Sequence, residues 1–584
     1  MSMMAPSTAA FMLPRRHIPT LAHIGAFFSF VVLAMWFMQP VLGQPSTLAI
    51  GHPNNDVWNH VWGYGFVAQS LAQGEWPMHT DLLNWPHGGT LWFIDLVGAL
   101  ITLPINWASG PVAAYNASML IQWVLAGAGM YALAWRVTGS SAGAWAAGIA
   151  YQTMPHLMGQ AYNGISETLM AGFLPLALLG LRELFHRPSR STAIWAGIAV
   201  GATALANWYY GLFAGIALVG LLARALWRTG GRVSRSIVPI AIVFGATLTL
   251  IVAPAFVAFR ESMAATDAVV TRDPQFVWAT LVLHNMTDVV SFFRPGKHYS
   301  PDLKEMFGED LLVIVYLGHA LLWPALLGLR SDLRSRMKSW AWLGLGFFVL
   351  ALGPFLFIAG DYVSAFGGWI PLPFLALFEW TPMFSRISHA YRFTVGVTLA
   401  LCMLLAWSIR SFRNGRVPVW LIATVLVVFR VGESTLASPA PFPFPVSNAS
   451  VPAAISTLDG GAVLDLPVGR PVLARSQYSL AQLSHGQPSP YGLNDPLPQS
   501  LRSNRFLRFL VEMEYSTTAT LPAQLPWFDL EMGRQAAIAD GLKWIVMHEA
   551  SYPSGQFGRT ARFLDITTTP VHQGDGVRIY RVDP

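Results

Sequence analysis

The run TLAHIGAFFSFVVLAMWFMQPVL, residues 20–42, is the first of the apolar segments that decide the class of this protein. A helix of about 20 predominantly apolar residues is long enough to cross the hydrocarbon of a bilayer. Comparable runs recur through the first three quarters of the 584-residue chain, in which 54% of residues are hydrophobic and 11% are charged. This composition predicts a polytopic α-helical membrane protein and excludes a string of soluble domains.

Eleven segments fit membrane-spanning helices. They are residues 20–42, 112–135, 141–157, 167–185, 192–208, 210–227, 237–257, 310–329, 340–358, 393–409 and 418–433. Arginines occur in every loop on one side of this alternating scheme, whereas the short opposing loops near 158–166 and 208–210 hold no Lys or Arg. Because positively charged loops stay in the cytoplasm, the N-terminus is predicted inside. An odd number of spans then places the C-terminus outside.

The distribution of charge also excludes nucleic acid as a partner. The net charge is +6, but much of the basic charge is arginine in short loops between apolar segments, which is typical of membrane topology. The single cysteine, Cys402, lies inside a predicted span, so no intrachain disulfide can form.

Composition divides the chain into three parts. Residues 1–433 form the predicted transmembrane domain, and residues 434–450 are a linker rich in Pro, Ser and Ala. Residues 451–584 contain short strand-like runs separated by helical stretches, which is typical of a small extracytoplasmic α/β domain. The runs are residues 462–467, 543–547 and 576–582, with helical stretches near 498–514 and 530–541.

The long first outer loop, residues 44–110, is the strongest candidate for a functional site. It has no Lys or Arg, yet it is rich in carboxylates, histidines and tryptophans. Within it, Asp81 lies in a turn-rich aromatic stretch and is a candidate second carboxylate. Residues 93–107 are apolar but too short to span comfortably, so they are predicted to form an interfacial or re-entrant helix.

Asp56 and His60 are the leading pair in this loop. Asn54 or Asn55 is a good helix cap, which would place Asp56 in the first turn and His60 one turn later. A carboxylate and an imidazole at this spacing can ligate a divalent cation, or act as a general base with an orienting partner. Alternatively, Asp56 merely favours the helix dipole, while Trp58 and Trp62 belong to an interfacial aromatic belt.

A cationic cluster precedes the span at 393–409. Arg386, His389 and Arg392 are spaced three residues apart and would share one helical arc. The forked guanidinium groups match phosphate oxygens, so the cluster is a candidate phosphate site. Alternatively, the arginines extend to lipid headgroups. A second cationic candidate consists of Arg294, Lys297 and His298.

The segment between the spans at 141–157 and 167–185 holds His156 and Glu167. Both are expected near the outer surface, where substrate contact is one interpretation. The other is that Glu167 is a favourable charge at the start of a helix.

The order of these motifs resembles the GT-C superfamily of integral-membrane glycosyltransferases, especially its bacterial members. The resemblance rests on short sequences spread over nearly the whole chain. They are Asn54-Asn-Asp-Val-Trp-Asn-His-Val-Trp62, Trp85-Pro-His-Gly-Gly89, Pro371-Leu-Pro-Phe374 with Pro382, Arg386 and Tyr391-Arg-Phe393, Val463-Leu-Asp-Leu-Pro467 and Ser484-His-Gly-Gln-Pro488.

The resemblance implies a specific chemistry. GT-C enzymes pass a sugar from a polyprenyl-phosphate carrier to an acceptor outside the cytoplasm, using an acidic residue of the first outer loop, often with a divalent cation. By this similarity Asp56 is the base or a ligand of Mg²⁺ or Mn²⁺, and Arg386 and Arg392 hold the lipid phosphate. Many members have two adjacent acids in this loop, whereas Asn54 and Asn55 precede a single Asp here, so metal dependence stays open.

The leading hypothesis is therefore a glycosyltransferase of cell-envelope assembly in the bacterial inner membrane. Its acceptor would be an extracytoplasmic glycan, lipid or protein. A rival hypothesis is a non-catalytic protein that binds a lipid-linked glycan and presents it to a partner, with the C-terminal domain as an adaptor. A transporter is a third hypothesis, which the lack of a clear inverted repeat disfavours.

Overall fold

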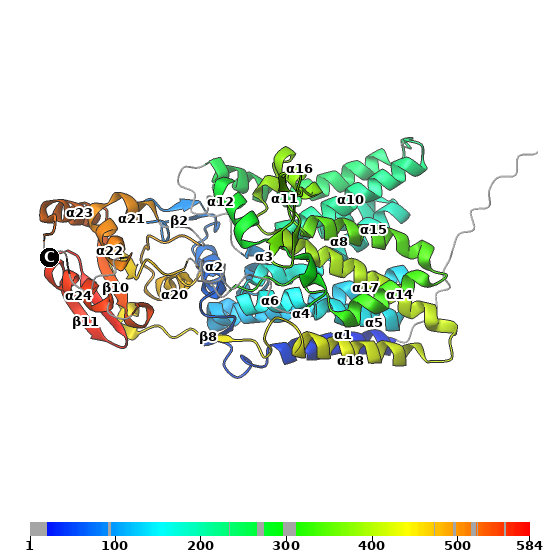
Figure 1. The fold of residues 1–584 in the computed structure, drawn as a ribbon, viewed down its shortest axis with the longest axis horizontal. Coiled ribbons are helices and arrows are strands. Elements are labelled where there is room, and N and C mark those ends of the chain that lie inside the picture. The colour runs from blue at the N-terminus through cyan, green and yellow to red at the C-terminus, as the bar shows by residue number, and fades with distance from the viewer. Residues whose placement is uncertain are drawn as a thin grey trace, which may run out of the picture.

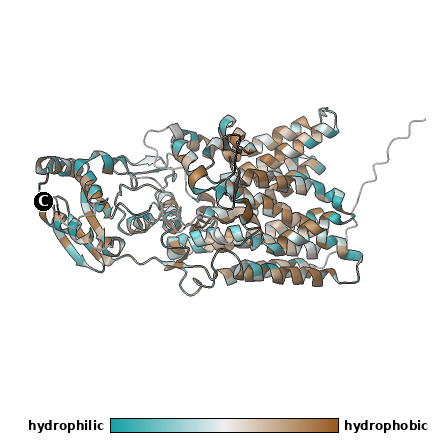
Figure 2. Cartoon of the chain, viewed as in Figure 1, coloured by the Kyte–Doolittle hydropathy of each residue, from teal (hydrophilic) through white to brown (hydrophobic). Residues whose placement is uncertain are grey.

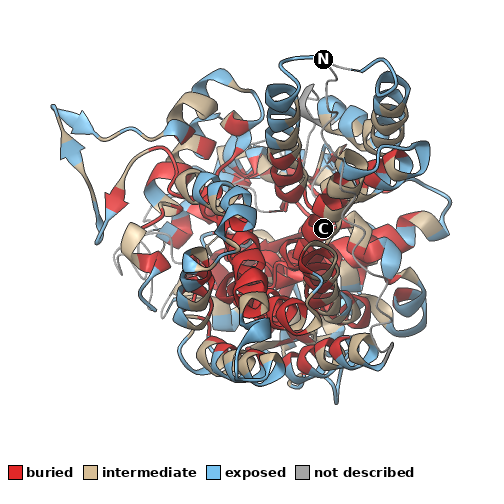
Figure 3. Ribbon diagram, turned by 90° about the vertical axis from the view of Figure 1, so that its right-hand side faces the viewer, coloured by how far each residue is buried: buried red, intermediate tan, exposed pale blue. Residues whose placement is uncertain are grey.

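The structure, a computed structural model, describes residues 20–90, 95–232, 234–264, 274–295, 311–471, 473–493, 498–515, 521, 524–553 and 556–583. The molecule is elongated, with a helical bundle at one end and the C-terminal domain at the other (Figure 1). Hydrophobic residues dominate the bundle, while the C-terminal domain alternates hydrophobic and hydrophilic residues (Figure 2). In an end-on view, buried residues gather along the middle of the bundle (Figure 3).

Six helical segments among the described residues are long and apolar enough to cross a membrane. Each overlaps one of the eleven predicted spans. They are built on α4 (Leu103–Thr138), α7 with α8 (Ser166–Leu169 and Phe173–His186), α10 (Trp208–Arg228), α11 (Val238–Ala264), α17 (Thr394–Ser411) and α18 (Val419–Leu436).

Four further helices occupy predicted spans but do not meet the same criteria. They are α1 (Thr20–Phe37), α5 (Ser141–Gln152), α9 (Arg190–Ala206) and α15 (Arg334–Ala351). At 1.5 Å per residue, the 12 residues of α5 extend about 18 Å, well short of the roughly 30 Å of hydrocarbon. The predicted span at 141–157 is therefore too short to cross alone.

The remaining elements of the bundle are short. The helices are α2 (Val57–Ala72), α3 (Leu96–Ile101), α6 (Pro155–Asn163), α12 (Pro274–Ala279), α14 (His319–Leu327) and α16 (Pro373–Trp380). The strand pairs are β2 (His79–Thr80) with β3 (Gly89–Thr90), β4 (Phe357–Ile358) with β5 (Asp361–Tyr362), and β6 (Ser364–Ala365) with β7 (Gly368–Trp369). The predicted helix over 93–107 corresponds to α3 and the start of α4, which kinks at Gly110.

The predicted span over 310–329 is wrong in its first half. Residues 311–318 have no helical structure, and α14 begins only at His319. The Asn163 side chain satisfies the backbone of Leu312, because its Nδ2 donates to the Leu312 carbonyl and its Oδ1 accepts from the Leu312 amide, both at 2.8 Å. Non-helical backbone inside a membrane protein is tolerated where other protein groups satisfy it in this way.

Close helix contacts in the bundle depend on small residues. Gly172 ends the turn η1 (Met170–Gly172) and faces α4, where a Cβ atom would overlap the backbone of Leu125. Gly220 of α10 is the opposite case, because it is exposed and no atom lies within 4 Å of the position of its Cβ.

We expect Gly172→Ala to destabilise the bundle by about 1–3 kcal/mol, since the added methyl group forces α4 and α8 apart. The matched variant Gly220→Ala is expected to be neutral or to stabilise by up to about 1 kcal/mol, because alanine is the better helix former. Thermal unfolding of the two variants in detergent measures the difference. Equal melting temperatures would contradict this account of the contact.

The C-terminal domain is built on a four-stranded sheet of order β11-β12-β10-β9. Strands β9 (Ala462–Leu466) and β10 (Leu542–His548) are parallel, and the other pairs are antiparallel. With β12 (Val577–Arg581), they coincide with the three predicted strand-like runs, whereas β11 (Thr569–Gly574) was not predicted. The helices are α19 (Ala453–Ser456), α20 (Ser476–His485), α21 (Gln499–Ser503), α22 (Arg505–Tyr515), α23 (Trp527–Ala539) and α24 (Gln556–Thr567).

The C-terminal domain contacts the loop 44–110 directly. In the segment predicted as a linker, β8 (Val446–Asn448) pairs in antiparallel fashion with β1 (Leu48–Ile50). Farther along the loop, the Trp85 indole donates to the carbonyl of Asp540 at 2.9 Å. The domain and the loop thus form one continuous hydrogen-bonded structure.

Candidate functional site

Asp56 and His60 lie together at the start of α2. The helix begins at Val57, so Asp56 itself is the residue before it, and the predicted capping by Asn54 or Asn55 is wrong by one or two positions. The spacing of the pair is as predicted: the His60 amide donates to the Asp56 carbonyl one turn earlier. Their side chains also approach, with Asp56 Oδ2 3.6 Å from His60 Nε2.

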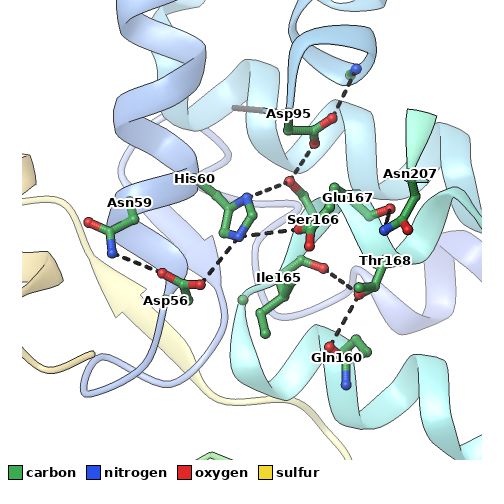
Figure 4. A network of polar contacts seen from close by, with 12 residues as sticks. Asp56, Asn59, His60, Asp95, Gln160, Ile165, Ser166, Glu167, Thr168 and Asn207 are labelled. Atoms are coloured by element: carbon green, nitrogen blue, oxygen red, sulfur yellow. Dashed lines mark hydrogen bonds and ion pairs between the residues drawn. The ribbon is translucent and has the colours of Figure 1, made fainter. Parts of the chain in front are cut away.

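A tight turn brings Glu167 to this pair. Helix α6 ends at Gly164, which has φ of +75° and packs so closely against Val57 that a side chain would collide there. The chain then enters α7, and Glu167 Oε2 comes to 3.4 Å from His60 Nε2 (Figure 4). Within the described structure, neither oxygen of the buried Glu167 carboxylate accepts a hydrogen bond.

A third acid, Asp95, completes the acidic side of the cluster. Its Oδ2 accepts hydrogen bonds from Ser166 at 2.5 Å and from Tyr64 at 2.7 Å, while its Oδ1 caps α3 through the Gly98 amide. The Ser166 hydroxyl also lies 3.3 Å from His60 Nδ1 (Figure 4). Asp95 was not selected from the sequence, although an Asp before a helical run is a capping signal.

Arg392 reaches the cluster from the segment before α17. Its Nη1 lies 3.6 Å from Glu167 Oε1, and its guanidinium stacks over the Tyr209 ring at 4.9 Å. The residue is buried, and its Nε forms no hydrogen bond within the described structure. Arg392 is thus a buried cation facing a buried acid.

The predicted helical arc of Arg386, His389 and Arg392 is wrong. Two short 3-10 turns, Phe384–Arg386 and Ala390–Phe393, are separated by Ile387 in an extended conformation, with φ of −86° and ψ of 106°. As a result Arg386 is exposed, whereas Arg392 is buried. His389 is half-buried, and its Nδ1 lies 2.7 Å from the Ser388 hydroxyl.

His156 lies beside the same turn. Its Nδ1 is 3.1 Å from the carbonyl oxygen of Ile314, so Nδ1 must carry the proton that it donates. The ring centroid is 5.8 Å from that of Tyr391, the neighbour of Arg392. The structure therefore places Asp56, His60, Glu167, Arg392 and His156 in one region.

The other candidate residues lie apart from this cluster. The Asp81 side chain is 86% exposed and pairs with His79. Arg294 is exposed. Its predicted companions Lys297 and His298 lie outside the described residues. Trp58 and Trp62 are buried, so they do not form the interfacial belt that was the alternative interpretation.

Opposing effects set the pKa of His60. Burial is the largest effect and lowers the pKa, because apolar surroundings disfavour the charged ring. The negative charges of Glu167, Asp56 and Asp95 outweigh burial and raise the pKa from 6.5 to about 9. At neutral pH His60 is therefore an imidazolium that compensates the surrounding carboxylates, as Arg392 does from the other side of Glu167.

The donor set does not fit the Mg²⁺ or Mn²⁺ that the resemblance implies. Both ring nitrogens of His60 already face protein groups, because Nε2 lies against the Asp56 and Glu167 carboxylates and Nδ1 faces the Ser166 hydroxyl. Among the described residues, no three His, Cys, Asp or Glu are arranged to hold a metal ion. The structure thus does not support metal ligation by Asp56 and His60.

No protein-family model and no curated protein sequence matches the chain. Solved structures do match. The cryo-EM structure of the arabinofuranosyltransferase AftD from Mycobacteria aligns with 96% of this chain at a TM-score of 0.56 and 14% identity. A second structure, of a mutant of that enzyme, aligns with 96% at a TM-score of 0.50 and 13% identity. This chain spans 40% and 41% of the lengths of those two chains.

These neighbours are GT-C glycosyltransferases. The chain has the GT-C fold. The oligosaccharyltransferase from Archaeoglobus fulgidus, in its apo form, is a weaker match, with a TM-score of 0.48, 12% identity, and coverage of 90% of this chain and 70% of that one. The resemblance seen in the sequence motifs is confirmed for the fold, which at 14% identity is all that the similarity assigns.

We expect the charge on His60 to stabilise the protein in a pH-dependent way. Because its pKa is raised on folding, this stabilisation is fully present below about pH 6.5 and is lost as pH rises through about 9. Replacing one partner of a buried ion pair typically costs about 3–5 kcal/mol. His60→Gln should therefore lower the melting temperature at pH 7, and the gap to wild type should narrow between pH 7 and 10.

The matched control is His79→Gln, since His79 is an exposed histidine that also pairs with an aspartate. It should melt like wild type at every pH. A gap between wild type and His60→Gln that stays constant up to pH 10 would disprove the charged state of His60.

Proposed function

We propose that this protein is a membrane glycosyltransferase that transfers a sugar from a polyprenyl-phosphate carrier to an extracytoplasmic acceptor. The observation that carries the proposal is the buried group of Asp56, His60, Glu167 and Arg392 in a GT-C fold. These residues come from the first loop, the α6–α7 turn and the segment before α17. A cluster of charges assembled from three distant segments needs a functional reason, because burying charge is costly.

Asp56 is the proposed general base. Its Oδ1 accepts a hydrogen bond from Asn59 at 2.9 Å, and its Oδ2 faces the His60 imidazolium. In the reaction, Asp56 takes the proton of an acceptor hydroxyl as that oxygen bonds to the anomeric carbon. The bond between the anomeric carbon and the phosphate oxygen breaks, and the polyprenyl phosphate leaves with the electron pair.

The two arginines suit the charge that develops on the departing phosphate. Arg386 is exposed, and we assign it to a lipid phosphate at the surface of the membrane. Arg392 is buried, and its guanidinium faces Glu167. A guanidinium matches phosphate oxygens in geometry and stays charged when buried, so it can stabilise the leaving group.

The positive-inside pattern supports the location of the site. Arginine-rich loops are predicted at the cytoplasmic end, and the loop 44–110 lies at the opposite end, next to the C-terminal domain (Figure 1). In the proposed orientation, the acids and the C-terminal domain are extracytoplasmic, in the inner membrane of a bacterium. The acceptor is then a glycan, lipid or protein of the cell envelope.

The test compares Asp56→Asn with Asp81→Asn in nanodiscs. An amide is isosteric with the carboxylate but cannot take the proton, so Asp56→Asn should lower turnover by about 10²–10⁴-fold. Asp81 lies in the same loop but is exposed, so Asp81→Asn should keep wild-type turnover. The donors are undecaprenyl phosphate conjugates of radiolabelled arabinose, glucose, mannose and galactose, and bacterial envelope extract supplies the acceptor. The measurement is the release of undecaprenyl phosphate from each donor.

Arabinose is included because the neighbour AftD is an arabinofuranosyltransferase. Undiminished turnover by Asp56→Asn would show that Asp56 is not the base. If wild type binds undecaprenyl phosphate but releases none from any donor, the protein is a non-catalytic binder of lipid-linked glycan.

A further inference from the structure

One face of helix α20 in the C-terminal domain forms hydrogen bonds with helix α2 and the turn before it. Ser476, Ser479 and Gln482 are spaced three residues apart on α20 and therefore lie on one side of it. Each bonds to a residue of α2 or the turn before it. Ser476 donates to the Asn55 carbonyl at 2.6 Å, Ser479 donates to Asn59 Oδ1 at 2.8 Å, and Gln482 Oε1 accepts from the Trp62 indole at 2.6 Å.

These contacts are shielded from water. The exposed fractions are 1% for Ser476, 8% for Ser479 and 1% for Gln482, and their partners on the other side are also buried. A buried polar group that loses its partner is left unsatisfied at a cost of about 1–3 kcal/mol. The contact is therefore specific in register, because a shift of α20 along α2 would leave all three bonds unmade.

The middle bond leads to Asp56. Asn59 Nδ2 donates to Asp56 Oδ1 at 2.9 Å, while Asn59 Oδ1 accepts from Ser479. The direction of these two hydrogen bonds is fixed, since an ionised carboxylate only accepts hydrogen bonds. Asn59 must present its NH₂ group to Asp56 and its oxygen to Ser479, and the Ser479 hydroxyl must then be the donor.

We propose that α20 holds the Asp56 carboxylate in position through Asn59, so that the C-terminal domain completes the site in the bundle. Ser479 and Asn59 are positioning residues in this arrangement. Without Ser479 the Asn59 amide loses a hydrogen bond that fixes its orientation, and its bond to Asp56 Oδ1 is weakened. Asp56 Oδ2 still faces His60, so the Asp56 carboxylate shifts but stays in the site.

The consequence for catalysis rests on the proposed function. A general base works only within hydrogen-bond reach of the proton that it removes, and small displacements reduce its contribution. The geometric claim, that Ser479 acts on Asp56 through Asn59, is independent of which reaction the site performs.

The first experiment therefore needs no substrate. Full-length protein in detergent is unfolded thermally as wild type, Ser479→Ala, Asn59→Ala, Asp56→Ala and the pairs that combine Ser479→Ala with each of the other two. Because Asn59 bonds to both Ser479 and Asp56, Ser479→Ala should lower the melting temperature of wild type more than that of either variant background. If Ser479→Ala lowers the melting temperature equally in wild type, Asn59→Ala and Asp56→Ala, the proposal is overturned.

The second experiment measures turnover with the donor that wild type uses in the nanodisc assay. Ser479→Ala should lower kcat about tenfold, less than the 10²–10⁴-fold expected for loss of the base, and leave KM unchanged. Ser479→Thr retains the hydroxyl and should restore most of the rate. Adding Ser479→Ala to Asn59→Ala should cause no further loss.

Trp62→Phe is the matched control, because it removes another buried bond of the same helix contact, about a turn and a half beyond Asp56. It should lower the melting temperature but leave kcat within about twofold of wild type. An equal fall of kcat in Trp62→Phe would show that only the stability of the contact matters, and would overturn the proposal. If instead Asp56→Asn retains turnover, Asp56 is not the base, and the thermal cycle alone decides the geometric claim. If wild type shows no turnover with any donor, the proposed function fails, and the thermal cycle again decides the geometric claim.

Discussion

Compensation of buried negative charge is the constraint on which this site depends. Asp56, Glu167 and Asp95 are all buried, and carboxylates that lose water must gain opposite charge or hydrogen bonds. Asp95 is satisfied by hydroxyl and amide donors, whereas Asp56 and Glu167 face the cations His60 and Arg392. The cations come from different segments than Glu167, so the charge balance itself ties the first loop, the α6–α7 turn and the segment before α17 together.

The architecture of the site follows from where the helices are interrupted. The Gly164 turn, the non-helical residues 311–318 and the break at Ile387 all interrupt helical structure near it. At residues 311–318, the Asn163 side chain satisfies both backbone groups of Leu312.

Sequence reasoning found the class of fold because membrane spans have a strong signal in length and hydropathy. It also paired Asp56 with His60, since their spacing is local and survives a one-residue shift of the helix start. It failed for Arg386 and Arg392, where a helical period was assumed across Ile387, and it did not select Asp95. It did not link Glu167 to Asp56, and it placed Arg392 in the same site as Asp56 only through the family resemblance, because contacts between distant segments depend on packing that no local pattern encodes.

The pairing of β1 with β8 has a consequence for how the two parts of the chain stay together. It joins the segment that follows α18, the last helix of the bundle, to the start of the loop 44–110. Residues 449–475 then connect β8 to α20, and linking two surfaces within one chain raises the effective concentration of one surface at the other. Even modest contacts then suffice to keep the domain seated. Separation of the domain from the bundle would require the strand pair and the hydrogen bonds between α20 and α2 to break together.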